Sequence, residues 1–329
     1  MKQNLQIPPW GYWVMIAAFV AFLVLAVFVI KRNGGIKRSF FSAPYGLWML
    51  IFTIVPCVLV AYYAFTDANG QLTVNNFINF WDSNHSANQM YAELGEDYAF
   101  LIKRGSVNID VLVYSLWMAL LCTAISLVIG YPAAYIMADK ELKIGTTVVV
   151  LFIIPMWMNF LLRTVAWVTL LEDTGLINTV LTALGLPRAQ LLYNNQAVLL
   201  GMVYNFLPFM VFPIYTSLSK MDTKLEEAAQ DLGANGVNTF LRVKLPLSLP
   251  GVISGITMVF MPSVTTFALP KLLGGSNTMM FGDLIESMFL TQNDWGVGSA
   301  LSLVMMVLIL ISLGILRKAD PEGEGGGIV

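Results

Sequence analysis

Seven long apolar stretches constrain this chain more than any other feature of its sequence. A helix needs roughly 20 mostly apolar residues to cross the hydrocarbon core of a bilayer. We predict a membrane-spanning helix at each stretch, over residues 13–30, 45–65, 111–138, 146–171, 197–218, 251–270 and 297–316. Pro208, Pro213 and Pro262 interrupt the fifth and sixth stretches, and neighbouring helices can satisfy the carbonyls that a proline frees.

Composition excludes most other classes of protein. Only 12% of the residues are charged and 57% are hydrophobic, whereas soluble domains carry about 25% charged residues. The two cysteines, Cys57 and Cys122, both fall inside predicted spans, and the single histidine, His85, lies in a polar loop. We therefore expect an all-α membrane protein with no metal site, no disulfide and no catalytic centre.

The basic residues indicate how the chain is oriented. With seven spans the loops form two alternating sets, of which one carries 12 Lys and Arg residues and the other five. Cytoplasmic loops carry the excess of basic residues, so we predict an external N-terminus and a cytoplasmic C-terminus. The external set also holds eleven carboxylates against its five bases. Such a surface is either an ordinary solvated face or a field that attracts cations.

Three further segments complete the organisation that we predict. The longest external loop, residues 66–110, is polar with scattered aromatics, and it is long enough to hold short helices but not a separate large domain. The apolar run 177–184, inside the external segment 172–196, is typical of a short interfacial or re-entrant helix. Residues 319–329 are rich in Gly and Glu and are predicted to be a disordered tail. The predicted domains are an extra N-terminal helix with a basic linker (1–44), a transmembrane domain (45–318) and this tail.

The longest cytoplasmic loop, residues 221–250, is patterned as two short helices. Thr223 and Glu226 have the spacing of a capping box that starts a helix. One face of this helix is apolar and is formed by Leu225, the pair at 228–229 and Leu232. The glycine at 233 has the residue type that is common just after a helix end. We predict a second helix over 238–244, stopped by prolines at 246 and 250. An apolar face on so short a helix needs cover, and docking into a partner's groove is the interpretation that we favour.

This segment resembles the EAA loop of ABC importer permeases. The matching residues are Glu227, Ala228, Ala229, Gly233, Val243, Leu245 and Pro246, with Val243 standing where the motif has isoleucine. We call residues 221–250 the EAA segment. In that family the loop forms a coupling helix that sits in a cleft of the ATPase subunit, so the resemblance implies that these seven residues form the ATPase-coupling loop.

The resemblance extends over about residues 45–316 and is closest to the spermidine/putrescine (PotB) type of permease. It is carried further by these patterns: Gly130-Tyr131-Pro132, Pro155-x-Trp157-x-Asn159 with Arg163, Gly201-x-Val203-Tyr204, Leu207-Pro208-Phe209-Met210 and Gly274-Gly275. It implies the type I importer fold, with a six-helix core, to which the stretch 13–30 adds a seventh span. The implied partners are an ATPase dimer that binds ATP and Mg, a second permease subunit (PotC-like) in a heterodimer, an external binding protein and a polyamine substrate. No nucleic-acid partner is expected.

Arg163 is the one basic residue inside a predicted span. An intramembrane charge is a functional-site hypothesis by default, and Trp157, Asn159, Arg163 and Tyr204 are therefore candidate gate or pathway residues. The alternative, which we favour from the sequence, is that Arg163 lies near the outer end of its helix, extends to the interface and pairs with Glu172 or Asp173.

Other functions stay open at this point. The solute could instead be ferric iron, a phosphonate or an opine. An ion-coupled secondary transporter would need buried carboxylates and repeat symmetry, and the predicted spans contain no mid-span Asp or Glu. The chain has no Gly-rich lysine loop for binding ATP, so a transporter driven by ATP requires a separate ATPase.

Overall fold

The computed structural model describes residues 20, 43–67, 70–81, 107–139, 152, 154–275 and 278–319. It divides into two compact units, which are treated separately below. The first comprises residues 1–77 and 295–303, and the second comprises residues 78–294 and 304–329. The predicted first span, 13–30, apart from residue 20, the predicted tail from residue 320 onward and most of the predicted loop 66–110 lie outside the described residues.

The described elements are helices, in this order: α2 (Ala43–Met49), η2 (Leu50–Ile54), α3 (Val55–Ala64), α4 (Asn75–Trp81), α6 (Val107–Ala138), α8 (Phe160–Leu171), α9 (Leu176–Ala183), α10 (Asn195–Ser219), α11 (Thr223–Asp231), α12 (Gly236–Thr239), η4 (Phe240–Lys244), α13 (Leu245–Thr265), η5 (Pro270–Gly274), α14 (Phe281–Leu290) and α15 (Trp295–Ala319). The η elements are single π-helical turns.

Four described helices are long and apolar enough to cross a membrane: Asn108–Ala138, Asn195–Ser219, Gly236–Thr265 and Trp295–Leu316. They agree with the third, fifth, sixth and seventh predicted spans, although the sixth has different ends. The predicted span 45–65 corresponds to the unbroken helical run of α2, η2 and α3, of which Leu50–Ala64 forms a shorter apolar helix.

Two predicted spans are wrong in their boundaries. The stretch 146–171 is not one helix, because the backbone turns extended at Asn159, whose side chain accepts hydrogen bonds from the first amides of α8. The stretch 251–270 ends as a helix at Thr265, since Thr266 is extended. Gly282 lies against this break, where an added Cβ would come within 2.5 Å of the Thr265 carbonyl oxygen. Apolar periodicity cannot detect either break.

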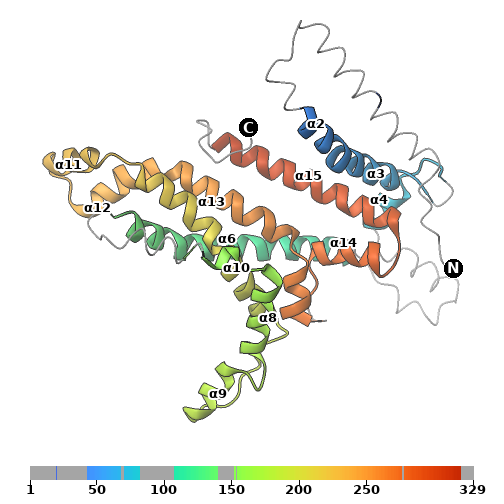
Figure 1. The fold of residues 1–329 in the computed structure, drawn as a ribbon, viewed down its shortest axis with the longest axis horizontal. Helices are drawn as coiled ribbons and strands as arrows, with labels where there is room; N and C mark the ends of the chain where they lie inside the picture. Colours follow the sequence, from blue (N-terminus) through green and yellow to red (C-terminus); the bar gives the residue numbers. More distant parts are fainter. Residues whose placement is uncertain are drawn as a thin grey trace, which may run out of the picture. The chain divides into compact units, whose positions relative to one another are not determined.

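In the second unit α6, α10 and α13 pack side by side around a buried methionine (Figure 1). Met210 is fully buried, and Cβ atoms added to Gly130 or Gly255 would lie 3.1 and 2.8 Å from its side chain. A Cβ on Gly251 would lie 2.7 Å from the Pro213 carbonyl oxygen. Small residues let membrane helices approach this closely, which explains why glycines recur where these three helices cross.

The first unit is held by one amide at the end of α3. Asn76 Nδ2 donates to the carbonyl oxygens of Tyr63, Ala64 and Thr66 at 3.0–3.2 Å. The Tyr63 and Ala64 carbonyls are among those that a helix C-terminus leaves without a partner in the helix, and Thr66 follows the helix end. The Tyr63 ring also lies 5.9 Å from that of Trp295, so α3 and the start of α15 pack within the same unit.

Candidate functional site

The helix α11 begins one residue earlier than its capping pattern suggests. Asp222 is the N-cap, and its side chain accepts a hydrogen bond from the Lys224 amide at 3.0 Å. The predicted capping box with Thr223 as N-cap is therefore wrong. With Asp222 as N-cap, Glu226 no longer has the capping-box spacing of three residues after the cap, and its carboxylate pairs with Lys244 Nζ at 2.8 Å.

The end of α11 is as predicted. Gly233 has φ +86°, a left-handed conformation that glycine adopts without a Cβ penalty. Its amide donates to Gln230 at 2.8 Å, and the Ala234 amide donates to Ala229 at 3.0 Å. These two bonds form a Schellman motif, which closes the helix after Leu232.

The predicted apolar face of α11 is uncovered. Leu225 is 50% exposed, Leu232 is 90% exposed, and no residue of α11 is buried. Glu227 and Ala228 are exposed as well, and Ala229 is half-buried. Figure 1 shows α11 and α12 at one end of the α6–α10–α13 bundle, opposite α14. An apolar helix face left open at the tip of a bundle is suited to docking into a groove of another protein.

The second half of the EAA segment differs from the prediction. α12, η4 and α13 form one uninterrupted helical run from Gly236 to Thr265, so Pro246 and Pro250 do not stop it. The ring of Pro246 would clash with the carbonyl of Arg242 in a regular α-helix. Arg242 lies in the π turn of η4, where the wider backbone relieves that contact.

Lys244, which the sequence marked only as a basic loop residue, is the centre of a polar cluster. Besides Glu226, its Nζ donates to Tyr135 Oη at 3.1 Å and lies 4.9 Å from the centre of the Tyr135 ring. Phe240 packs edge-on against both Tyr135 and Tyr131. The Tyr131 hydroxyl is 2.9 Å from Ser248 Oγ. The cluster thus joins α6, α11, η4 and α13, and no sequence signal identifies contacts of such long range.

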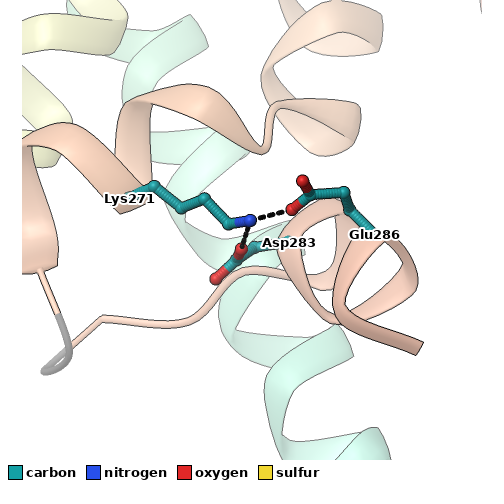
Figure 2. A network of polar contacts seen from close by, with 3 residues as sticks. All are labelled: Lys271, Asp283 and Glu286. Carbon is teal, nitrogen blue, oxygen red and sulfur yellow. Dashed lines mark hydrogen bonds and ion pairs between the residues drawn. The ribbon is translucent and has the colours of Figure 1, made fainter. Parts of the chain in front are cut away.

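A second lysine cluster lies at the opposite end of the bundle, between η5 and α14 (Figure 2). Lys271 pairs with Glu286 and, at 3.5 Å, with the buried Asp283. The hydrogen bond to Glu286 raises the pKa of Lys271. Burial raises the pKa of Asp283, and the charge of Lys271 opposes that rise. This end is also fixed by the Tyr193 amide, which donates to the Leu273 carbonyl at 2.8 Å.

Three of the four candidate gate residues lie around the break before α8. Asn159 caps that helix. Arg163 is buried, donates from Nη1 to the Pro155 carbonyl at 2.9 Å and lies 5.9 Å from the centre of the Tyr204 ring. Trp157 is 87% exposed and does not join them.

The favoured prediction for Arg163 is wrong. It lies in the first turn of α8, whereas Glu172 follows the last turn, and among the described residues Arg163 pairs with neither Glu172 nor Asp173. The prediction placed Arg163 at the wrong end of its helix, because apolar periodicity does not reveal the break at Asn159. Its Nε is buried and has no hydrogen-bond partner among the residues that the structure describes.

The glycine patterns that carried the resemblance are packing sites. A Cβ on Gly201 would lie 2.2 Å from the Leu273 side chain, and one on Gly274 would lie 2.9 Å from Val198. Both glycines therefore allow η5 to rest directly on α10. We found no cluster of His, Cys, Asp and Glu within the described residues that could hold a metal ion.

Comparison with known proteins gives three results. Residues 127–322 match a family described as binding-protein-dependent transport system inner membrane component. The chain is 33% identical over 281 residues to the spermidine/putrescine transport system permease protein PotB of Haemophilus influenzae, covering 83% of this chain and 90% of that protein. It is 37% identical over 213 residues to the Escherichia coli protein of the same name, covering 64% and 78%.

The third result concerns the fold. The chain is similar to a crystal structure of a bacterial ABC transporter involved in the import of the acidic polysaccharide alginate, with a TM-score of 0.63 and 17% identity over 88% of this chain and 97% of that one. A crystal structure of that transporter with an alginate-pentasaccharide-bound periplasmic protein gives a TM-score of 0.59 and 15% identity, over 85% and 96%. The predicted importer transmembrane fold is thereby confirmed.

Proposed function

Since this chain belongs to the family of binding-protein-dependent transport system inner membrane components, we propose that it is the permease subunit of an ATP-driven importer of spermidine and putrescine. Membership makes the chain a multi-pass membrane protein and a transport subunit that is not itself catalytic. The observation that carries the substrate is the 33% identity to a spermidine/putrescine permease over 90% of that relative's length. The eleven carboxylates predicted on the outer face agree with a cationic solute.

We propose that α11 is the coupling helix that docks on the ATPase. Its open apolar face, its exposed Glu227 and Ala228, and its rigid end at Gly233 support this role. ATP and Mg would be bound by the ATPase dimer, whose closure moves α11. A partner can shift the equilibrium between inward-open and outward-open states only through its differential affinity for the two.

The remaining features are proposals of the same kind. We place the N-terminus outside and the C-terminus in the cytoplasm, from the bias of basic residues. The permease domain would span 45–318, with 1–44 as an added helix. A second, PotC-like permease and an external binding protein would complete the complex. Cysteine accessibility at the exposed residues Gln230 and Leu290, from opposite sides of the membrane, tests the orientation.

Arg163 and Tyr204, with Asn159, are proposed as gate residues in a supporting sense. An unpaired arginine would repel a polyamine, so Arg163 is unsuited to contact the substrate. Its bond to the Pro155 carbonyl closes the turn before α8, and Tyr204 holds it from α10 with Trp167 packed edge-on, 5.2 Å away. Trp157 is 87% exposed and would face lipid or the second permease.

The test is uptake of radiolabelled spermidine and putrescine by vesicles that contain the chain with its ATPase, second permease and binding protein. We expect ATP-dependent accumulation that unlabelled polyamines abolish. Accumulation that ferric iron, a phosphonate or an opine abolishes, and polyamines do not, would refute the substrate. Accumulation that persists without the ATPase and follows an ion gradient would refute ATP-driven import.

A further inference from the structure

We propose that Lys244 is a positioning residue that ties α11 to α6, so that the two helices move as one body when a protein bound to α11 moves. The proposal rests on the coupling role given to α11 above. It concerns the step after docking, in which motion of a short peripheral helix must reach the membrane-spanning bundle.

The attachment of α11 to the bundle shows why such a tie is needed. The helix has no buried residue, and the apolar side chains of Leu225 and Leu232 are 50% and 90% exposed. Its ends connect to the bundle through short loops at 220–222 and 232–235. A helix that is held by loops alone rotates about them when a partner pulls on it. Without a further contact, movement of the partner would rotate α11 and would not displace the bundle.

Lys244 supplies a side-chain connection across the middle of α11. An ammonium group has three donors, and two of them are used, by Glu226 of α11 at 2.8 Å and by the Tyr135 hydroxyl of α6 at 3.1 Å. The side chains of Lys244 and Glu226 are only 20% and 35% exposed. Charge-assisted bonds of this kind are stronger than neutral ones, and partial burial reduces their screening by water.

The receiving side of the tie is rigid. Tyr131 and Tyr135 lie one turn apart on α6, and the Phe240 ring packs edge-on against both. The distance between ring centroids is 5.9 Å to Tyr131 and 5.6 Å to Tyr135. The Tyr131 hydroxyl is bound to Ser248 of α13. A displacement that Lys244 passes to Tyr135 therefore reaches α6 and α13 together.

Next to this tie the structure leaves room for α11 to move. A cleft of about 440 Å³ separates α11 from the ends of α6 and α10, with Leu218, Leu225, Gln230 and Val243 among its walls and Lys244 at its edge. Lys244, Glu226 and Tyr135 all line this cleft, so the Lys244 bridge forms part of its wall. Without the bridge nothing in these contacts would keep the cleft at a fixed width.

The experiment measures the distance between spin labels on Gln230 of α11 and Ile136 of α6, both exposed, in the assembled transporter. A Cys57→Ser background removes the exposed native cysteine. With Lys244 present we expect one narrow distance distribution, unchanged by a non-hydrolysable ATP analogue. In Lys244→Met the distribution should broaden and shift with the analogue. Solute imported per ATP should fall by about tenfold or more, the scale of a lost hydrogen bond to a charged group.

Two variants and one control make the result decisive. Tyr135→Phe removes only the hydroxyl and should broaden the distribution to a smaller extent, whereas Lys220→Met removes an exposed charge outside the tie and should behave as the unaltered chain. A narrow, unshifted distribution in both Lys244→Met and Tyr135→Phe would overturn the proposal. The measurement of the distance between the spin labels does not depend on which substrate is transported. Failure of the unaltered chain to import spermidine would therefore refute the substrate and leave the distances to decide the role of Lys244.

Discussion

Two short amphipathic helices of the second unit, α9 and α11, end in the same way. Gly185 and Gly233 follow them with φ +78° and +86°. After α9 the Gly185 amide donates to Thr182 at 3.0 Å and the Leu186 amide to Leu181 at 2.9 Å, the same Schellman pair that closes α11. In neither case would a Cβ on the glycine meet another atom within 4 Å.

The two helices differ in what holds them. Asn178 of α9 is 1% exposed, and its amide donates to the carbonyls of Glu172 and Ala189 while it accepts from the Ala189 amide. No residue of α11 is buried, and its side chain Glu226 reaches the bundle through Lys244. The same type of helix end thus occurs in two settings: α9 is anchored by its own chain, whereas α11 keeps an uncovered apolar face, which we propose the ATPase covers.

We expect the largest effect from removing the Asn178 side chain, which anchors α9. Asn178→Ala removes three hydrogen bonds and leaves the polar groups of Ala189 without them, which should cost about 2–4 kcal/mol of unfolding free energy. The readout is denaturation of the purified protein followed by tryptophan fluorescence. The matched change on α11, Gln230→Ala, removes an exposed side chain and should stay within about 0.5 kcal/mol. Equal losses in the two variants would contradict the distinction between an anchored and an open helix.

The second prediction compares the same substitution at the two helix-ending glycines, Gly233 after α11 and Gly185 after α9. Valine disfavours the left-handed conformation, so Gly233→Val and Gly185→Val should each cost about 1–2 kcal/mol at the helix end. Only Gly233→Val should weaken co-purification of the ATPase and lower uptake, by about five- to thirtyfold, since 1.4 kcal/mol corresponds to a factor of ten. If Gly185→Val released the ATPase to the same extent, the assignment of α11 as the docking helix would fail.

The third prediction concerns the start of α11. Removing a good N-cap costs about 1 kcal/mol, so Asp222→Ala should weaken ATPase binding by roughly fivefold, as measured by titration of the ATPase onto the reconstituted permease. Thr223→Ala should have little effect, because Thr223 is the first helical residue rather than the cap. The reverse order of effects would restore the capping box that the sequence suggested.

Much of this site was readable from the sequence because it is local. The spacing of Leu225 and Leu232 predicted the helix, and Gly233 predicted its end, since both depend on residues within a few positions. The choice between Asp222 and Thr223 as N-cap was not readable. Both residue types cap helices, and the backbone conformation that selects Asp222 appears only in the structure.

The long-range part could not be predicted. Lys244 and Tyr135 are 109 residues apart, and no pattern within one segment brings them together. Pro246 predicted a helix stop, yet the π turn at 240–244 carries the helix past it. The prediction for Arg163 failed because the helix breaks at Asn159. That break depends on capping and not on hydropathy. Arg163 therefore lies at the start of a short helix and not near the end of a long one.

The smallest effect concerns the lysine at the anchored end. α8 contacts both α9 and η5, and Lys271 ties η5 to α14 through Glu286 and Asp283. The hydrogen bond to Glu286 raises the pKa of Lys271 above its ordinary 10.5. A group whose pKa is raised by folding adds stability that is complete below the unfolded value and is lost as the pH rises through the folded one.

The contribution of Lys271 to the free energy of unfolding should therefore be constant from about pH 7 to 10. Above pH 10.5 the free energy of unfolding should fall by about 0.2–1 kcal/mol. The expected fall is small because Lys271 is 45% exposed. Lys271→Met should remove this alkaline step and leave ATPase binding at α11 unchanged. Denaturation at several pH values, compared between the two proteins, measures the step. If Lys271→Met instead released the ATPase, the two ends of the bundle would be coupled more tightly than their separate lysine clusters imply, and the contrast between an anchored end and an open one would have to be abandoned.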